Sequence, residues 1–190
     1  MKDLQTLLAD LVSGDDARAE GSIPLIIESG EAAIPALLDL TRAESMDARW
    51  WAVRVLAESP HARTVDLVPL LKDSSSEVRA AAALALCNHP HELALPDLVA
   101  SLSDEDALVS GLAGNALVKI GSPAVPALLE VMQNLPIKVR IPALRALVEI
   151  KDQRAIPVMM KCLEDDSAIL QYWAREGLER LGLDMVYIKP

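Results

Sequence analysis

Residues 77–86 read EVRAAAALAL, and this stretch decides the fold because its pattern recurs along the chain. With Arg79 as the anchor, the residue before it is apolar, the residue three later is small, and the residue seven later is leucine. At 100° per residue, these three positions occupy about 80° of a helix surface and form one stripe. The stretch therefore predicts a helix that buries this stripe and packs closely through its small residue.

Equivalent anchors stand 30 or 31 residues apart, and each has a leucine seven residues later. The anchors are Arg18, Arg49, Arg79, Ser110, Arg140 and Gln171, and the leucines are Leu25, Leu56, Leu86, Leu117, Leu147 and Leu178. Fourteen residues before four of the anchors stands a proline, at Pro35, Pro96, Pro126 and Pro157. Proline is favoured in the first turn of a helix, where its missing N–H costs nothing, so each of these prolines marks the start of another helix. We therefore predict an all-α chain, an α-solenoid of about six helical hairpins that share one core.

The predicted solenoid is a single domain over residues 1–182. Its units cover about residues 1–30, 31–61, 62–91, 92–122, 123–152 and 153–182. The apolar tail, residues 183–190, is expected either to cap the last unit or to dock onto another chain.

Composition narrows the possible partners. The chain is 52% hydrophobic but only 3% aromatic, which disfavours a β-sandwich or barrel. The net charge of −10 and the absence of a basic run disfavour binding to nucleic acid or to an anionic membrane. The longest apolar run, Ala80–Cys87, is too short to insert across a membrane. Two cysteines give no disulfide framework, so we expect a cytoplasmic protein.

Motifs for catalysis are scarce. The three histidines, His61, His89 and His91, all fall between predicted hairpins. The sequence has no H-E-x-x-H motif, no glycine-rich phosphate loop and no paired Cys-x-x-Cys. We therefore predict no catalytic residues, no metal site and no cofactor.

Three segments resemble a known repeat family. They are AIPALL at 33–38, EVRAAA at 77–82 and AVPALL at 124–129. The pattern resembles short HEAT repeats, and is most similar to the HEAT-like repeat named for phycobiliprotein lyases.

The resemblance implies a structural ladder between neighbouring units, formed by the arginine of the second helix and the acid two residues before it. The ladder residues are Arg18, Arg49, Arg79 and Arg140 with Asp16, Asp47 and Glu77. The last three units have Leu108, Lys138 and Ile169 in place of the acid. We expect the ladder to be complete only in the N-terminal half.

The resemblance also implies that the second helices line a concave groove. The positions one, two, five and nine residues after each anchor point away from the buried stripe. The candidate partner-binding residues on this face are Trp50, Trp51, Arg54, Leu84, Asn88, Leu112, Asn115, Lys119, Ile141, Arg145, Tyr172, Trp173 and Arg180. Trp51 and Trp173 lie close to the stripe, so groove and core both remain open for them. The charged residues are also placed to form i, i+4 pairs with glutamates on the helix surface.

Four of the five aromatic residues fall on this face, and aromatic residues and arginine are enriched where proteins bind one another. We therefore predict a non-catalytic scaffold or adaptor that binds a peptide, helix or protein partner. The alternatives are a subunit that handles a bilin, as the phycobiliprotein lyases do, and a structural subunit of a larger assembly.

Overall fold

The computed structural model describes residues 2–183, and within them every regular element is a helix. The chain divides into two compact units, Met1–Ala94 and Leu95–Pro190. Unit 1 contains α1 (Leu4–Leu11), α2 (Asp16–Glu28), η1 (Gly30–Ala33), α3 (Ile34–Leu40), α4 (Met46–Glu58), α5 (Thr64–Leu67), η2 (Val68–Lys72), α6 (Ser76–Asn88) and η3 (Glu92–Ala94). Unit 2 contains α7 (Leu95–Ser101), α8 (Ala107–Ile120), η4 (Ser122–Ala124), α9 (Val125–Asn134), α10 (Ile137–Ile150), η5 (Gln153–Ala155), α11 (Ile156–Cys162) and α12 (Ala168–Arg180).

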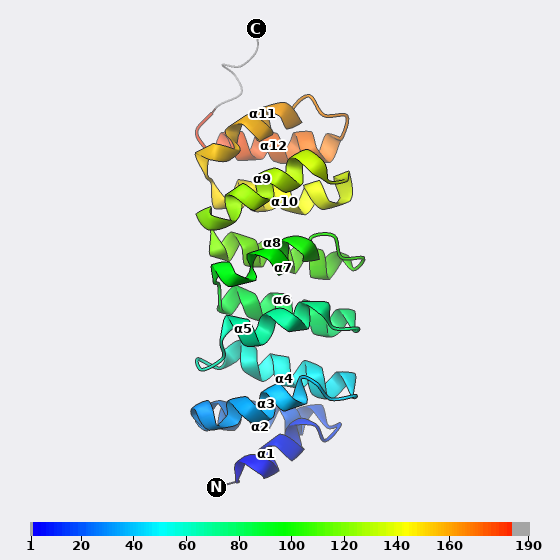
Figure 1. The fold of residues 1–190 in the computed structure, drawn as a ribbon, viewed down its shortest axis with the longest axis vertical. Helices are drawn as coiled ribbons and strands as arrows, with labels where there is room; N and C mark the ends of the chain where they lie inside the picture. Colours follow the sequence, from blue (N-terminus) through cyan, green and yellow to red (C-terminus); the bar gives the residue numbers. More distant parts are fainter. Residues whose placement is uncertain (1, 184–190) are drawn as a thin grey trace. The chain divides into compact units, whose positions relative to one another are not determined.

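Each unit consists of three helical hairpins (Figure 1). The even-numbered helices are the second helices of the hairpins, and within each unit they pack on one another, as α4 does on α6 and α10 on α12. Side chains from the preceding turn cap several of them. Ser45 accepts a hydrogen bond from the backbone N–H of Ala48, for example, and Asp106 accepts from Leu108 and Val109. The predicted α-solenoid class of helical hairpins is confirmed.

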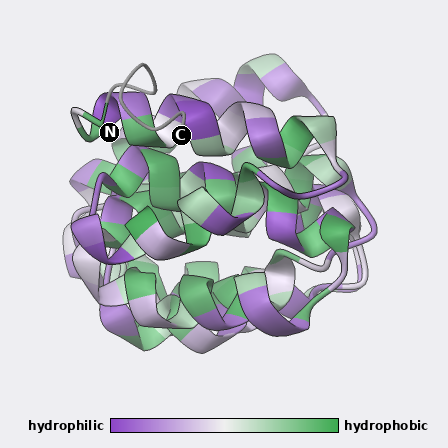
Figure 2. Cartoon of the chain, turned by 90° about the horizontal axis from the view of Figure 1, so that it is seen from above, coloured by the Kyte–Doolittle hydropathy of each residue, from purple (hydrophilic) through white to green (hydrophobic). Residues whose placement is uncertain are grey.

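The buried stripe follows the repeat in five of the six hairpins. The leucines Leu56, Leu86, Leu117, Leu147 and Leu178 are at most 1% exposed, and the small residues Ala52, Ala82, Ala113, Ala143 and Ala174 are fully buried. First helices add a second layer with Leu37, Leu67, Leu98, Leu128 and Met159. The helices carry both hydrophobic and hydrophilic residues (Figure 2), because one side of each helix is buried in the core and the other is not. The core therefore lies between the first and second helices of each unit.

The predicted register is wrong in the first hairpin. Leu25 is 41% exposed, whereas Ile26 next to it is fully buried. Helix α2 buries Ala19, Ser22, Ile23 and Ile26, a stripe one residue later than predicted. The predicted stripe contains Gly21, which has no side chain to bury. The observed stripe instead buries two isoleucines, Ile23 and Ile26, and this explains the shift.

The third hairpin departs from the pattern for a different reason. Its first helix is divided into α5 and the 3-10 helix η2, and Pro69 lies at the start of η2. Because proline has no N–H to donate, an α-helix cannot continue unbroken through this position. The first helices α3, α9 and α11 place proline in their first turn, where no such hydrogen bond is lost.

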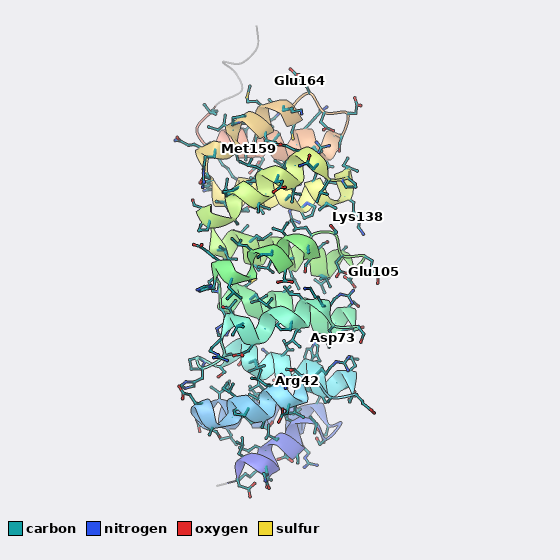
Figure 3. The ribbon with its side chains drawn as sticks, viewed as in Figure 1. Arg42, Asp73, Glu105, Lys138, Met159 and Glu164 are labelled. Atoms are coloured by element: carbon teal, nitrogen blue, oxygen red, sulfur yellow. The ribbon has the colours of Figure 1, made fainter. Side chains whose placement is uncertain are left out.

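The arginine ladder differs from the expectation in its acidic partners. Arg49 donates to both carboxylate oxygens of Asp73, from Nε at 2.8 Å and Nη2 at 2.9 Å. Asp73 lies in the turn between η2 and α6 of the next hairpin (Figure 3). Asp47 is two residues before Arg49, about 200° around the helix, so it points elsewhere. Glu77 likewise accepts from Ser75 Oγ at 2.5 Å within its own helix start.

The ladder is also not confined to the N-terminal half. In unit 2, Arg140 Nη2 donates to Asp165 Oδ2 at 2.6 Å, across to the turn between α11 and α12. In the first hairpin, by contrast, Arg18 binds Asp10 of α1, and Asp16 has no ion pair among the described residues. The expectation failed because the acid that matters belongs to the turn of the next hairpin and not to the helix of the arginine.

Both ladder aspartates have a lowered pKa. The hydrogen bond from Arg140, followed by that from the Ser167 backbone N–H, holds the pKa of Asp165 below its ordinary value. Burial alone raises the pKa of Asp73, but the hydrogen bonds from Arg49 and the Ser75 N–H outweigh it and lower the pKa. These carboxylates therefore contribute to folding stability in their ionised form.

Helix α12 approaches its neighbours most closely at Gly177. A Cβ atom added there would lie 2.7 Å from Val148 Cγ2 of α10 and 2.7 Å from Met159 Sδ of α11, the residue labelled in Figure 3. The methyl groups of valine cannot move without shifting the helix, because its χ1 is stiff. The packing of α12 therefore requires glycine at this position.

We predict that Gly177→Ala lowers the free energy of unfolding by about 1–3 kcal/mol, the usual cost of overpacking a core. Urea unfolding followed by circular dichroism measures it. Gly111→Ala is the matched control, because nothing lies within 4 Å of its added Cβ. Alanine's better helix propensity should make that variant more stable by about 0.5–1 kcal/mol. Equal effects of the two substitutions would contradict the close approach.

We predict that Asp165→Asn destabilises the protein at pH 7 by about 1–2 kcal/mol, since it leaves the half-buried Arg140 without its anionic partner. The folded-state pKa of Asp165 is lowered, so its contribution is present above about pH 4 and disappears as pH falls through that pKa. The stability difference from wild type should therefore shrink in urea titrations as the pH is lowered below about pH 4. Asp166→Asn, at an exposed neighbouring position, should show little difference at any pH. A gap that does not change with pH would rule out the ion pair as its source.

Candidate functional site

The predicted groove residues lie on second helices of both units. In unit 2, Tyr172 is 57% exposed, which makes it the most exposed aromatic residue among the described residues. Its ring and that of Trp173 are edge to face, with centroids 5.2 Å apart and planes at 75°. The guanidinium of Arg145, from α10, lies 5.3 Å from the centroid of the Trp173 ring. These three residues form an exposed aromatic–arginine cluster, which we call the Tyr172 cluster.

The Tyr172 cluster has a charged border. Arg180 donates from Nη1 to Glu149 Oε1 at 2.6 Å and from Nε to Glu176 Oε1 at 2.8 Å. The hydrogen bonds that Arg180 donates, first to Glu176 and then to Glu149, raise the pKa of its guanidinium. Because Glu149 belongs to α10 and Arg180 to α12, the bond to Glu149 connects the two second helices, whereas the bond to Glu176 stays within α12.

The remaining predicted residues of unit 2 are less closely associated. Asn115 and Lys119 of α8 are exposed, and Leu112 of α8 and Ile141 of α10 are half-buried. Asn115 and Arg145 line a hollow of only about 20 Å³ together with Gly111 and Glu149. A space of this size is too small for a ligand, so this stretch offers a surface and not a pocket.

In unit 1, the two tryptophans have different environments. Trp50 is half-buried, whereas Trp51 is only 9% exposed. Their rings are nearly perpendicular at 82°, with centroids 4.9 Å apart. Arg54 forms an ion pair with Glu58, one turn later on α4. On α6, Leu84 is 53% exposed, and Asn88 donates to the carbonyl of Ala57 at 3.1 Å.

Both tryptophans line a cleft of about 400 Å³ that the sequence pattern did not predict. It lies where the first turns of α2 and α4 meet the turns that precede them. Its lining consists of Val12, Gly14, Asp16, Glu20, Ser45, Asp47, Ala48, Trp50 and Trp51, and we call it the acidic cleft. The sequence pattern predicts a ladder role for Asp16 and Asp47 and no role for Glu20. The acids in the first turns of two successive second helices, beside the Trp50-Trp51 pair, were the signal that could have found it.

The described residues show no arrangement for a metal ion and no membrane-spanning helix. They hold no group of three or more His, Cys, Asp or Glu side chains placed to bind a metal. Among them, no single helix is long and apolar enough to cross a membrane. The segments Ala107–Ile120 and Ser122–Asn134 reach that length only together, with a bend of 117° between them. The predicted tail, from residue 184 onward, lies outside the described residues.

Two families of helical repeats match parts of the chain. The family described as HEAT repeats matches residues 64–136, and the PBS lyase HEAT-like repeat matches residues 139–165. No curated protein matches the chain.

Solved structures share the fold. A designed armadillo repeat protein in complex with the peptide (KR)4 is 20% identical with a TM-score of 0.56, and the match covers 95% of this chain and 100% of that one. The complex of CpcE and CpcF of phycocyanin lyase from Nostoc sp. PCC7120 is 24% identical with a TM-score of 0.58, covering 75% and 96%. An engineered protein is 24% identical with a TM-score of 0.57, covering 95% and 99%.

These matches agree with the repeated stripe of buried Leu and Ala and with the arginines that bind an aspartate in the turn of the next hairpin. The chain belongs to the HEAT-like repeat proteins.

Proposed function

We propose that this chain is a non-catalytic interaction module that binds a polypeptide partner on the exposed side of its second helices. The observation that carries the proposal is the Tyr172 cluster. A tyrosine that is 57% exposed lies against a tryptophan whose ring also contacts an arginine guanidinium. Tyrosine, tryptophan and arginine are the residues that contribute most often to binding energy at protein interfaces.

The Tyr172 cluster also suits binding because it is already ordered. The edge-to-face ring contact and the arginine stacked on Trp173 restrict the three side chains before any partner arrives. Arg180 and its two glutamates hold α10 and α12 in register beneath them. A surface of this kind loses little side-chain entropy on association, which favours affinity.

Relatives with the same fold support the proposal. The designed armadillo repeat protein holds a peptide, and CpcE is found in a complex with CpcF. Both structures share the repeat fold of this chain, so this fold occurs in complexes with a peptide or with another protein. Trp50 and Trp51 of α4 occupy the same repeat positions as Tyr172 and Trp173, so each unit carries an aromatic pair on this side of a second helix.

We predict that Tyr172→Ala weakens binding of a selected peptide by at least about tenfold, the loss expected when an interface anchor is truncated. Peptides are first selected from a random display library on the immobilised full chain, and their affinities are then measured by fluorescence anisotropy. Val65→Ala is the matched control, because Val65 is also well exposed (48%) but lies on a first helix. The control should bind as wild type does. Selected peptides that bind Tyr172→Ala and wild type equally would refute the proposed surface.

A second candidate function is the handling of a bilin. The observation that favours it is the match of residues 139–165 to the PBS lyase HEAT-like repeat, which includes Arg145 of the Tyr172 cluster. An aromatic pair beside an arginine can stack on a tetrapyrrole and bind its propionate groups.

We predict for this candidate that adding phycocyanobilin to the full chain changes the bilin absorbance spectrum, and that Trp173→Leu reduces the change. An unchanged spectrum with wild type removes the bilin from consideration and leaves the interaction module unaffected.

A further inference from the structure

The acidic cleft of unit 1 contains three carboxylates that no cation among the described residues neutralises. Asp16 and Glu20 come from α2 and Asp47 from α4, and none of them has an ion pair among the described residues. The arginines nearest in sequence are engaged elsewhere. Arg18 binds Asp10, and Arg49 binds Asp73 through Nε and Nη2 and the carbonyls of Ala43 and Glu44 through Nη1. The cleft therefore carries a local negative charge that a bound cation would balance.

The shape of this charge favours an extended cation over a metal ion. Within residues 2–183, no three acidic or histidine side chains converge on a point where a metal could bind. The carboxylates instead line a space of about 400 Å³, which is large enough for a whole side chain. A planar guanidinium has five N–H donors and can reach carboxylates that are spread apart, whereas an ammonium is a compact point charge.

The tryptophans give the cleft a second feature that suits a guanidinium. Trp50 and Trp51, with their rings at 82°, form one wall and offer a π surface for stacking. Trp51 is only 9% exposed, and its indole N–H has no hydrogen-bond acceptor among the described residues. This N–H is not sealed from water, so a carbonyl oxygen of a bound backbone can reach it and accept its hydrogen bond.

We infer that the acidic cleft binds an arginine side chain of a partner polypeptide, whose backbone passes over Trp51. The inference rests on the proposed interaction function and names the chemistry of the partner: a basic segment that contains arginine. The net charge of −10 supports it, because an acidic surface attracts basic segments and speeds their association.

Three fluorescein-labelled nonapeptides of alternating glycine and a test residue distinguish the possibilities by anisotropy at 50 mM and 150 mM salt. The test residues are arginine, lysine and citrulline, the last of which keeps the shape of arginine without its charge. The full chain should bind the arginine peptide several-fold more tightly than the lysine peptide, and the citrulline peptide at least about tenfold more weakly. Lysine binding equal to or tighter than arginine binding would overturn the inference.

The decisive variant neutralises the cleft with Asp16→Asn, Glu20→Gln and Asp47→Asn together. Its matched control, Glu92→Gln, Glu105→Gln and Glu164→Gln, changes the net charge equally at exposed positions that do not line the cleft; Glu105 and Glu164 are labelled in Figure 3. The cleft variant should bind the arginine peptide at least about tenfold more weakly, and the control within about twofold of wild type. Equal weakening by both would show general charge attraction and refute the cleft.

Further measurements separate failure of the cleft from other failures. Thermal melts followed by circular dichroism establish that each triple variant is folded before binding is compared. Trp50→Leu keeps the apolar bulk and should remove the preference for arginine over lysine. If display-selected peptides still depend on Tyr172 while arginine peptides ignore the cleft, the arginine inference falls and the proposed function stands.

Discussion

No hairpin of this chain can cover its own apolar stripe, and the rest of the structure depends on this constraint. The second helices have 13 or 14 residues, too few to be stable alone in water. Their buried leucine and alanine positions gain stability only against the helices of neighbouring hairpins, as α8 and α12 provide for α10. Small residues at the contact permit this approach, and at Gly177 even a methyl group does not fit.

Burial of one side of each second helix leaves the opposite side for function. The hairpins contain turns in which aspartate and serine cap the next helix, and the turn aspartates Asp73 and Asp165 also bind an arginine of the hairpin before them. Packing and ladder together fix the spacing of the second helices within a unit. The Tyr172 cluster draws its residues from two such helices and the acidic cleft from two others, so both sites depend on that spacing.

Much of the Tyr172 cluster could be predicted from the sequence, and little of the acidic cleft. Counting from the repeat anchor, which needs only the geometry of one helix, predicts Tyr172 on the exposed side and leaves Trp173 open between groove and core. The position of Arg145 over the Trp173 ring depends on the packing of α10 against α12, which no helical wheel contains. The cleft also depends on the first hairpin, where the predicted register was off by one residue and Glu20 was given no role.

The sequence by itself determined the helical class, the repeat and the residues buried in five of six hairpins, because these follow from the periodicity of local side-chain pattern. The tertiary structure decided the register of α2, where Ile23 and Ile26 bury in place of Leu25. It also decided the partners of the arginines, since Asp73 and Asp165 are about 25 residues away from them along the chain and adjacent only after the hairpins pack. A repeat pattern specifies which face of a helix is apolar. Which polar groups meet depends on how neighbouring hairpins are offset, and packing between them sets that offset.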